Sequence, residues 1–208
     1  MSASVKQSAK DKILEAALSV IRAKGYAATS VDDLCTAAGV TKGAFFHHFD
    51  SKEALAVAAA DYWSELTGAL FAEAPYHSHA DPLDRVLGYI DFRKALLRGE
   101  LPQFTCLVGT MVQETYDSSP AIRDACARSI TGHVANLEAD LGAAMAKYRI
   151  KSSCTAASLA LYTQAVLQGA FIIAKANDNS KEAAACVDHL RRYVELLFNR
   201  RQKKEKAP

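Results

Sequence analysis

The stretch VDDLCTAAGVTKGAFFHHFDSK, residues 31–52, decides the fold of the N-terminal part of this chain. Its first half places apolar residues at helical spacing, and Gly39 ends that helix after barely two turns. Thr41 can cap a second short helix that runs to His48. A helix, a short glycine-containing turn and a second helix together predict a helix-turn-helix.

The second helix is unusually rich in aromatic and histidine side chains for so short a segment. Phe45 and Phe49, four residues apart, are expected to anchor its inner face. In a helix-turn-helix the second helix enters the major groove of DNA, where small residues at its start permit close approach. His47 and His48 point about 100° apart, so DNA contact is favoured over metal chelation. The residues of this helix expected to face DNA are Thr41, Lys42, Gly43, Ala44, Phe46, His47 and His48.

Two further helices flank this unit. Apolar residues recur at helical spacing over residues 10–24, and Gly25 follows as a natural stop. Thr29 or Ser30 can cap the next helix. A longer helix is predicted from residue 51 to about 73, and its first amides, near Lys52, can meet a phosphate.

The segment ILEAALSVIRAKGYAATSVDDLCTAAGVTKGAFFHHFDSKEAL, residues 13–55, closely resembles the DNA-binding domain of the TetR family of transcriptional regulators. The resemblance implies that Thr29 and Ser30 hold phosphates, that residues 41–48 form the recognition helix, and that Lys52 contacts the DNA backbone. The family usually has tyrosine where this chain has Phe46. Because a hydroxyl is lost there, stacking or methyl contact is expected from Phe46.

Helical periodicity continues through the rest of the chain, so the predicted fold class is all-α with about nine helices. Further helices are predicted over about 83–97, 104–116, 120–148, 153–176 and 180–201, with a loop at 75–82. The expected domains are a DNA-binding domain at 8–68 with its helix-turn-helix at about 31–50, and a ligand-binding and dimerisation domain at 69–202. A basic tail at 203–208 follows.

The last two predicted helices are candidates for a dimer interface. Small residues in the first would let helices approach closely, and the second carries the apolar stripe Val187, Leu190, Val194 and Leu197. The pair could dock on its symmetry mate as a four-helix bundle, or both stripes could face their own core. The TetR resemblance favours a homodimer through these helices.

A pocket for an unknown small-molecule effector is expected where polar or aromatic residues interrupt apolar helix faces. Cys106 starts the segment CLVG, where helix-start amides favour a thiolate, so a sensor thiol and a buried inert thiol are both open interpretations. The candidate ligand-binding residues are Trp63, Tyr89, Phe92, Arg93, Phe104, Cys106, Gln113, Tyr162, Gln164 and Gln168.

Composition and motifs argue against other classes. The five cysteines are scattered without a CxxC pair, so free thiols are expected. No run approaches the roughly 18 consecutive apolar residues of a membrane span, so a cytoplasmic protein without membrane contact is expected. The net charge of +2 permits a local basic surface only. His77, His79 and Asp81 could hold a metal, but a solvent loop is the simpler interpretation. His133 is expected to be a satisfied helix residue. No catalytic constellation or cofactor motif is visible, so no enzyme is expected.

The sequence therefore predicts a transcriptional regulator, and most simply a ligand-responsive repressor that binds a palindromic double-stranded DNA operator as a dimer. A second hypothesis is a helical ligand-binding or thiol-based sensor that acts through protein contacts without operator binding.

Overall fold

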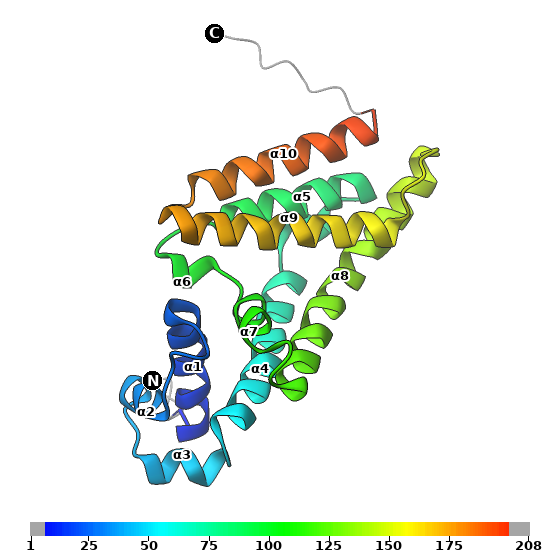
Figure 1. The fold of residues 1–208 in the computed structure, drawn as a ribbon. Helices are drawn as coiled ribbons and strands as arrows, with labels where there is room; N and C mark the ends of the chain where they lie inside the picture. Colours follow the sequence, from blue (N-terminus) through cyan, green and yellow to red (C-terminus); the bar gives the residue numbers. More distant parts are fainter. Residues whose placement is uncertain (1–6, 200–208) are drawn as a thin grey trace, which may run out of the picture. The chain divides into compact units, whose positions relative to one another are not determined.

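The computed structural model describes residues 7–199, and within that range every regular element is helical. This confirms the predicted all-α class (Figure 1). The basic tail at 203–208 lies outside the described residues. The helices are α1 (Ala9–Lys24), α2 (Val31–Ala38), α3 (Lys42–His48), α4 (Lys52–Ala72), the 3-10 helix η1 (Pro75–Ser78), α5 (Pro82–Ala95), α6 (Leu101–Phe104), α7 (Leu107–Thr115), α8 (Pro120–Tyr148), α9 (Ala156–Asn177) and α10 (Lys181–Leu197).

Side-chain caps fix where several helices begin. At the start of α2, Ser30 accepts a hydrogen bond from the backbone N–H of Asp33, and the Asp33 carboxylate accepts one from the backbone N–H of Ser30. The same reciprocal box, formed by Ser8 and Asp11, starts α1. Each box satisfies donors that the first helical turn leaves without intrahelical partners. At the other end of α2, Gly39 has a φ of 64° in the left-handed region, which glycine adopts without strain.

Residue contacts divide the chain into two compact units that do not follow the predicted boundary near residue 68. The first unit contains the N-terminal residues up to 70 together with residues 105–131, and the second contains residues 71–104 and those from 132 onward. The first unit is not contiguous in sequence because α7 and the beginning of α8 pack with the N-terminal helices. Of the described residues, α4 and α8 each contribute to both units.

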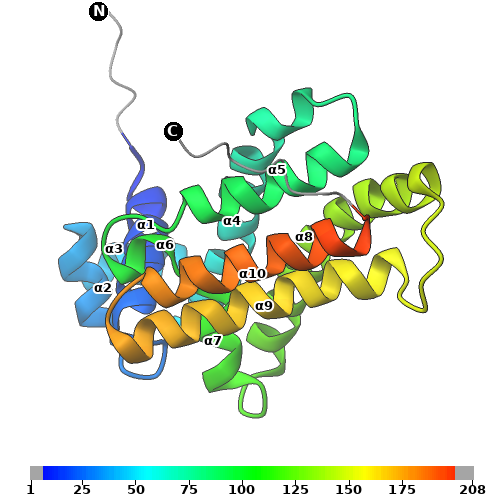
Figure 2. The same cartoon turned by 90° about the horizontal axis from the view of Figure 1, so that it is seen from above.

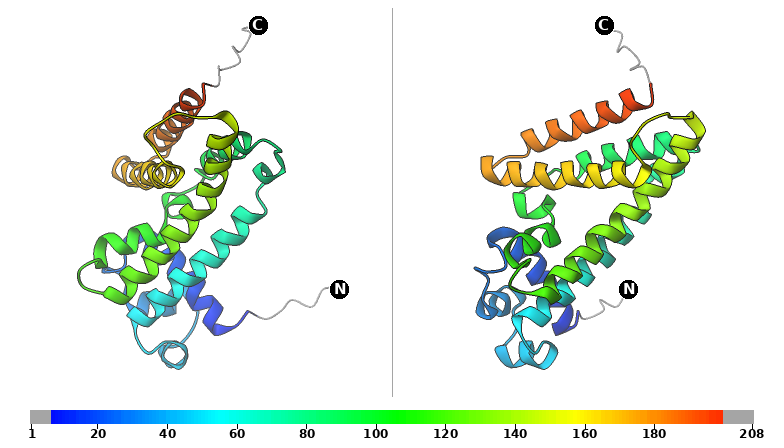
Figure 3. Two further views of the ribbon diagram at one scale, coloured as in Figure 1. Left: turned by 90° about the vertical axis from the view of Figure 1, so that its right-hand side faces the viewer. Right: turned by 45° about the vertical axis from the view of Figure 1, so that its right-hand side comes forward.

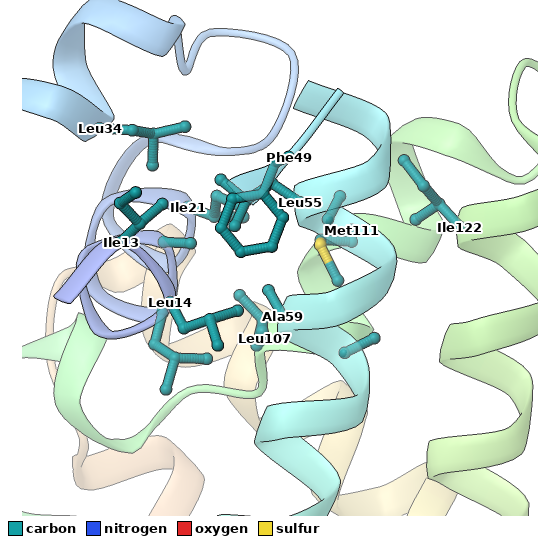
Figure 4. Packing of buried hydrophobic residues seen from close by; sticks show 14 of the residues in the cluster. Ile13, Leu14, Ile21, Leu34, Phe49, Leu55, Ala59, Leu107, Met111 and Ile122 are labelled. Atoms are coloured by element: carbon teal, nitrogen blue, oxygen red, sulfur yellow. The ribbon is translucent and has the colours of Figure 1, made fainter. Parts of the chain in front are cut away.

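The core of the first unit joins segments far apart in sequence. Ile13 and Ile21 of α1, Phe49, and Leu55 of α4 lie around Met111 of α7, and all five are buried (Figure 4). Burying such side chains is worth about 1.5–3 kcal/mol each. The helix-turn-helix is therefore held by residues that follow it by some sixty positions as well as by its own neighbours.

In the second unit, α9 and α10 lie side by side (Figures 1 and 2), and α10 also packs against α5. Both views of Figure 3 show the same pairing of α9 with α10. Two ion pairs join α5 to α10: Lys94 with Asp188 at 2.7 Å, and Arg191 with Asp91 at 2.8 Å. Helix α10 therefore packs against both α5 and α9, and the two ion pairs join it to α5.

The predicted apolar stripe of α10 faces the protein's own core. Val187, Leu190 and Val194 are all buried, which is the second of the two interpretations left open by the sequence. These residues are therefore not free to meet a partner. The exposed large apolar residues of the two helices are Leu161, Tyr162, Ile172 and Ile173 on α9, and Tyr193 and Leu196 on α10.

Smaller differences from the sequence predictions concern connections. Residues 75–82 were expected as a loop, but Pro75–Ser78 form a 3-10 helix, and Tyr76 within it is buried. The four-residue α6 was not predicted. The segment 104–116 was expected as one helix, whereas α7 begins at Leu107 with Cys106 as its cap. Short elements such as these lack the repeated apolar spacing on which the predictions depended.

One helix of the described residues, α9, is long and apolar enough to cross a membrane by length and composition, with a mean hydropathy of 1.5 in its best window. The sequence criterion of about 18 consecutive apolar residues did not identify α9, because Thr163, Gln164 and Gln168 interrupt its apolar run. Core helices of soluble proteins meet the same criterion, and α9 packs against α10 in the second unit. Helix packing accounts for the buried part of its composition, which is 39% of that window.

Candidate functional site

Two buried aromatic side chains hold the inner face of helix α3. Phe45 is fully buried, and its ring lies 5.9 Å from that of Phe49, at the end of the helix. The hydroxyl of Thr41 accepts a hydrogen bond from the backbone N–H of Ala44 at 3.1 Å, so the predicted cap is present. Because the two buried rings fix the inner face, Lys42, Phe46 and His47 of this seven-residue helix are left exposed.

The outer face of α3 is accessible to a large partner. Phe46 is 52% exposed, and its ring meets Phe45 edge to face with centroids 5.2 Å apart. Thr41, Lys42, Gly43 and His47 are exposed, while Ala44 and His48 are partly buried. A Cβ added at Gly43 would meet only the hydroxyl of Thr41, at an ordinary 3.7 Å. The exposed surface of α3 is therefore small and carries polar, aromatic and charged groups, with one formal charge from Lys42.

That charge is already paired. The ammonium of Lys42 lies 2.8 Å from a carboxylate oxygen of Asp32 on α2, and both side chains are well exposed. The hydrogen bond to Asp32 raises the pKa of Lys42 above its usual value. Exposed pairs of this kind are weak and are readily exchanged for another anion. Asp32 therefore competes with any phosphate for Lys42.

Two residues expected to contact DNA make hydrogen bonds within the protein. Thr29 is only 1% exposed, and its hydroxyl donates to the carbonyl oxygen of Gly25 at 2.6 Å. The ammonium of Lys52 donates to the carbonyl oxygens of Tyr26 and Thr29, at 3.0 and 2.9 Å, and lies 4.3 Å from the centre of the Tyr26 ring. Both side chains secure the turn before α2. Sequence spacing placed them at the correct helix ends but could not show which way they turn.

Ser30, in contrast, is exposed at the start of α2. Its hydroxyl donates to Asp33 at 2.7 Å, and Asp33 is also paired with Lys24 at 2.7 Å. The hydrogen bonds from Lys24 and Ser30 hold the pKa of Asp33 far below its usual value. The start of α2 thus carries fixed negative charge beside an exposed hydroxyl.

The ten candidate ligand residues do not form one group. Trp63, Cys106 and Gln113 belong to the first unit, where the Arg22 guanidinium lies 5.0 Å from the Trp63 ring centre and the Gln113 amide donates to the carbonyl oxygen of Gly109 at 2.6 Å. Cys106 caps α7, and its Sγ accepts from the Gly109 backbone N–H at 3.4 Å. These three side chains have structural contacts of their own.

The remaining seven candidates lie in the second unit, and the structure separates Tyr162 from the rest. The Tyr162 ring is exposed and meets Tyr193 of α10 at 5.3 Å. Tyr89, Phe92 and Arg93 of α5 belong to an aromatic cluster that also contains Phe71. Phe71 and its neighbour Tyr76 were missed, because isolated aromatics near helix ends carry no periodic signal.

Two of the histidines and the acid that were weighed as metal ligands are engaged in hydrogen bonds. His133 accepts from or donates to the Tyr89 hydroxyl at 2.8 Å, as expected of a satisfied helix residue. The ring of His77 forms a hydrogen bond with the carbonyl oxygen of Phe71 at 2.9 Å. Asp81 accepts from Lys147 at 2.9 Å and from Tyr148 at 2.7 Å. Within residues 7–199 no three potential ligands come together.

Comparison with known proteins decides the family. Residues 13–59 match the family described as bacterial regulatory proteins, tetR family. Residues 82–189, more than half of the chain, match the C-terminal domain described as transcriptional regulator LmrA/YxaF-like. The chain belongs to the TetR family. It is therefore a TetR-family transcriptional regulator, and the members of this family are DNA-binding regulators, not enzymes. The predicted regulator class is confirmed at this level.

Relatives of this TetR-family protein match it over the DNA-binding part. An uncharacterized HTH-type transcriptional regulator, YerO of Bacillus subtilis, is 39% identical over 54 residues, which are 26% of this chain and 19% of that protein. IcaR of Staphylococcus aureus strain Newman, named as a negative transcriptional regulator of the biofilm operon icaADBC, is 37% identical over 46 residues, 22% of this chain and 25% of its own. The chain thus spans about a quarter or less of these curated relatives.

Solved structures extend the likeness to the whole fold. A TetR-family regulator from Agrobacterium tumefaciens superposes with a TM-score of 0.79 at 22% identity, covering 89% of this chain and 96% of the other. The reduced form of E. coli NemR gives a TM-score of 0.73 at 23% identity, with the same coverage. At such identities the likeness concerns the fold alone.

Proposed function

We propose that this TetR-family protein is a ligand-responsive repressor that binds a palindromic operator as a homodimer. The observation that carries the proposal is the exposed face of α3. Lys42, Phe46 and His47 project from a helix that Phe45 and Phe49 fix from behind. Such a rigidly anchored second helix is the element that enters the major groove in helix-turn-helix proteins.

The contacts proposed for each part of this surface differ. Gly43 and Ala44, at the start of α3, allow close approach to base edges, and Lys42 and the two histidines supply donors to phosphates or bases. Phe46 offers apolar contact with a thymine methyl group or the sugar. Ser30 contributes a hydroxyl to the backbone from the start of α2. Thr29 and Lys52 act indirectly, by fixing the turn that positions α2.

Dimerisation is proposed through the outer faces of α9 and α10. Leu161 is 60% exposed and Leu196 is 75% exposed, and Ile172 lies on the same face of α9 as Leu161. Between them, Ala165 and Gly169 would let a second copy approach closely. A two-fold interface of this kind would give the two recognition helices the spacing of about 34 Å that successive major grooves require.

Repression and its release are proposed on two grounds. The relative IcaR is named as a negative regulator, and a repressor needs no additional contact with the transcription machinery beyond occupying its site. A ligand bound in the second unit would release DNA if it binds more tightly to a conformation with wrongly spaced recognition helices. A protein that acts in this way on chromosomal DNA would work in the cytoplasm.

The proposal is tested by fluorescence anisotropy with DNA from the protein's own upstream region, titrated at several salt concentrations. Sequence-selective, salt-dependent binding with two proteins per site is expected. A variant with alanine at Thr41, Lys42 and His48 should lose selectivity, whereas the matched variant Lys151→Ala, exposed in the second unit, should bind normally. Equal binding to scrambled DNA, or an unchanged triple variant, would refute operator recognition and favour a sensor that acts through protein contacts.

A further inference from the structure

Arg93 occupies an unusual position in the second unit. Its guanidinium carbon lies 5.3 Å from the centre of the Phe71 ring and 5.7 Å from that of Phe171 on α9. A guanidinium near two aromatic faces is held by cation–π attraction, which leaves its hydrogen-bond donors free for another group. Among residues 7–199 no carboxylate forms an ion pair with Arg93.

Three acidic residues of the same unit are paired with other cations. Asp140 pairs with Arg85 at 2.7 Å, Asp188 with Lys94 at 2.7 Å, and Asp91 with Arg191 at 2.8 Å. The positive charge of Arg93 is therefore not offset by a neighbouring acid in the described part of the chain. A partly buried cation without a counter-ion favours the binding of an anion.

The helix α9 adds two amide groups to this region. Gln164, Gln168 and Phe171 are spaced by four and three residues, so they lie on one face of the helix. Because Phe171 contacts the guanidinium, this is the face turned towards Arg93. Gln164 is only 7% exposed, and its Oε1 is buried without a hydrogen-bond partner in the described residues, as is the Nε2 of Gln168.

Buried amide atoms without partners are rare in native proteins, and each calls for a group that satisfies it. Other polar groups of the cluster have partners. The Tyr89 hydroxyl is bonded to His133 at 2.8 Å, and the Tyr76 hydroxyl donates to the carbonyl oxygen of Phe71 at 3.4 Å. Burial lowers the pKa of His133 to about 4, so this ring is neutral at pH 7. Arg93 thus remains as the positive charge of this cluster, and the face of α9 that meets it through Phe171 also carries one acceptor and one donor without partners in the described residues.

We propose that the second unit binds an aromatic carboxylic acid that also carries a hydroxyl group. Its carboxylate would accept hydrogen bonds from the Arg93 guanidinium and the Nε2 of Gln168. Its hydroxyl would donate to the Oε1 of Gln164, and its ring would lie against Phe71 and Phe171. This chemistry satisfies the charge and both amide atoms at once. The inference rests on the proposed function only in naming this acid as the effector.

The test is isothermal titration calorimetry of the full-length protein without DNA. The probes are 4-hydroxybenzoate and 4-hydroxycinnamate, each compared with its primary amide, which has the same shape and no charge. Both acids are expected to bind at least tenfold more tightly than their amides. Arg93→Gln should abolish that preference, whereas Arg98→Gln, an exposed arginine five residues further on, should leave it unchanged.

A second variant separates binding from folding. Gln164→Met removes the unpaired oxygen while keeping the side chain's length, so the midpoint of thermal unfolding without ligand should stay the same or rise. Its affinity for 4-hydroxybenzoate should fall to that for benzoate. Equal affinity of acids and amides, wild-type affinity in Arg93→Gln, or no binding of either acid would overturn the proposal. Binding without release of operator DNA would support this site while refuting the proposed ligand response.

Discussion

The carboxylate of Glu114 on α7 accepts a hydrogen bond from the backbone N–H of Ala27 at 2.7 Å, and a second from that of Tyr26 at 3.2 Å. From the other side, the Lys52 ammonium donates to the carbonyl oxygens of Tyr26 and Thr29. The turn between α1 and α2 is therefore held by one acid and one base from distant parts of the first unit. This turn determines where α2 begins, and thereby supports the helix-turn-helix.

Replacing Glu114 with alanine should loosen this turn. Because the carboxylate is exposed, the expected loss in the free energy of unfolding is only about 1 kcal/mol, measured by urea denaturation. Hydrogen exchange of the Tyr26 and Ala27 amides should accelerate more than exchange in α9. The exposed Asp117→Ala is the matched control. Unchanged exchange at both amides in Glu114→Ala would show that the two hydrogen bonds do not hold the turn in solution.

Lys42 should contribute to DNA binding through charge. Lys42→Ala is expected to weaken binding to all sequences alike, and to reduce the slope of log affinity against log salt by about 1 for each protomer that loses a phosphate contact. Asp32→Asn removes the carboxylate that competes for Lys42, so its affinity should rise slightly. The measurement is anisotropy over a range of salt concentrations. If Lys42→Ala keeps the wild-type slope, Lys42 makes no phosphate contact.

Phe46 should tolerate a hydroxyl group. Since its ring is about half exposed, Phe46→Tyr should not alter stability, and the added hydroxyl should strengthen DNA binding about 2- to 10-fold by donating to a phosphate. Phe46→Ala should weaken binding without unfolding the domain. Phe45→Ala, at the fully buried neighbour, should instead cost about 3–5 kcal/mol of stability. Equal DNA affinity of all three side chains at position 46 would place it outside the interface.

Leu161 provides a test of the dimer. Leu161→Glu would place two carboxylates near each other across a two-fold interface, and should raise the dimer dissociation constant at least about tenfold. Leu66→Glu, at an exposed leucine of α4, is the matched control. Analytical ultracentrifugation measures the dissociation constant, and circular dichroism verifies that both variants remain helical. A dimer that survives Leu161→Glu as well as Leu66→Glu must use another face.

His133 should make stability depend on pH. Burial lowers its pKa from the ordinary 6.5 to about 4, so between these values the unfolded chain binds a proton that the folded protein does not. The contribution of neutral His133 to the free energy of unfolding is therefore fully present above pH 6.5, and it is lost as the pH falls towards 4. The loss between pH 6.5 and 4.5 should be about 2 kcal/mol larger in the wild type than in His133→Gln, which does not titrate. Parallel pH profiles of the two proteins would show that His133 does not carry this dependence.

The local elements were largely predictable because their signals are local. Ser30 caps α2, Gly39 ends it, and Phe45 and Phe49 are buried, as spacing and residue type indicated. Hydrogen bonds between residues three or four apart depend little on the rest of the chain. The all-α class and the helix-turn-helix follow from such contacts.

The directions of several side chains required the tertiary structure. Spacing placed Thr29 and Lys52 at helix ends, but only the structure shows that their side chains donate to the carbonyl oxygens of Gly25 and Tyr26. In the same way, the apolar stripe of α10 was compatible with a dimer interface, which the sequence favoured, and with the protein's own core. Packing against α5 and α9 decided for the core, since these helices cover that face.

By itself, then, the sequence determined the longer helices, the caps of α2 and α3, and the family to which the helix-turn-helix at residues 31–52 belongs. Only the tertiary structure decided that α7 joins the first unit, and that Arg93 lies beside Phe71 and Phe171 without an acid. The physical reason is the range of the interactions. Capping and helical periodicity act within a few residues, whereas burial and charge pairing depend on groups brought together from distant positions by packing.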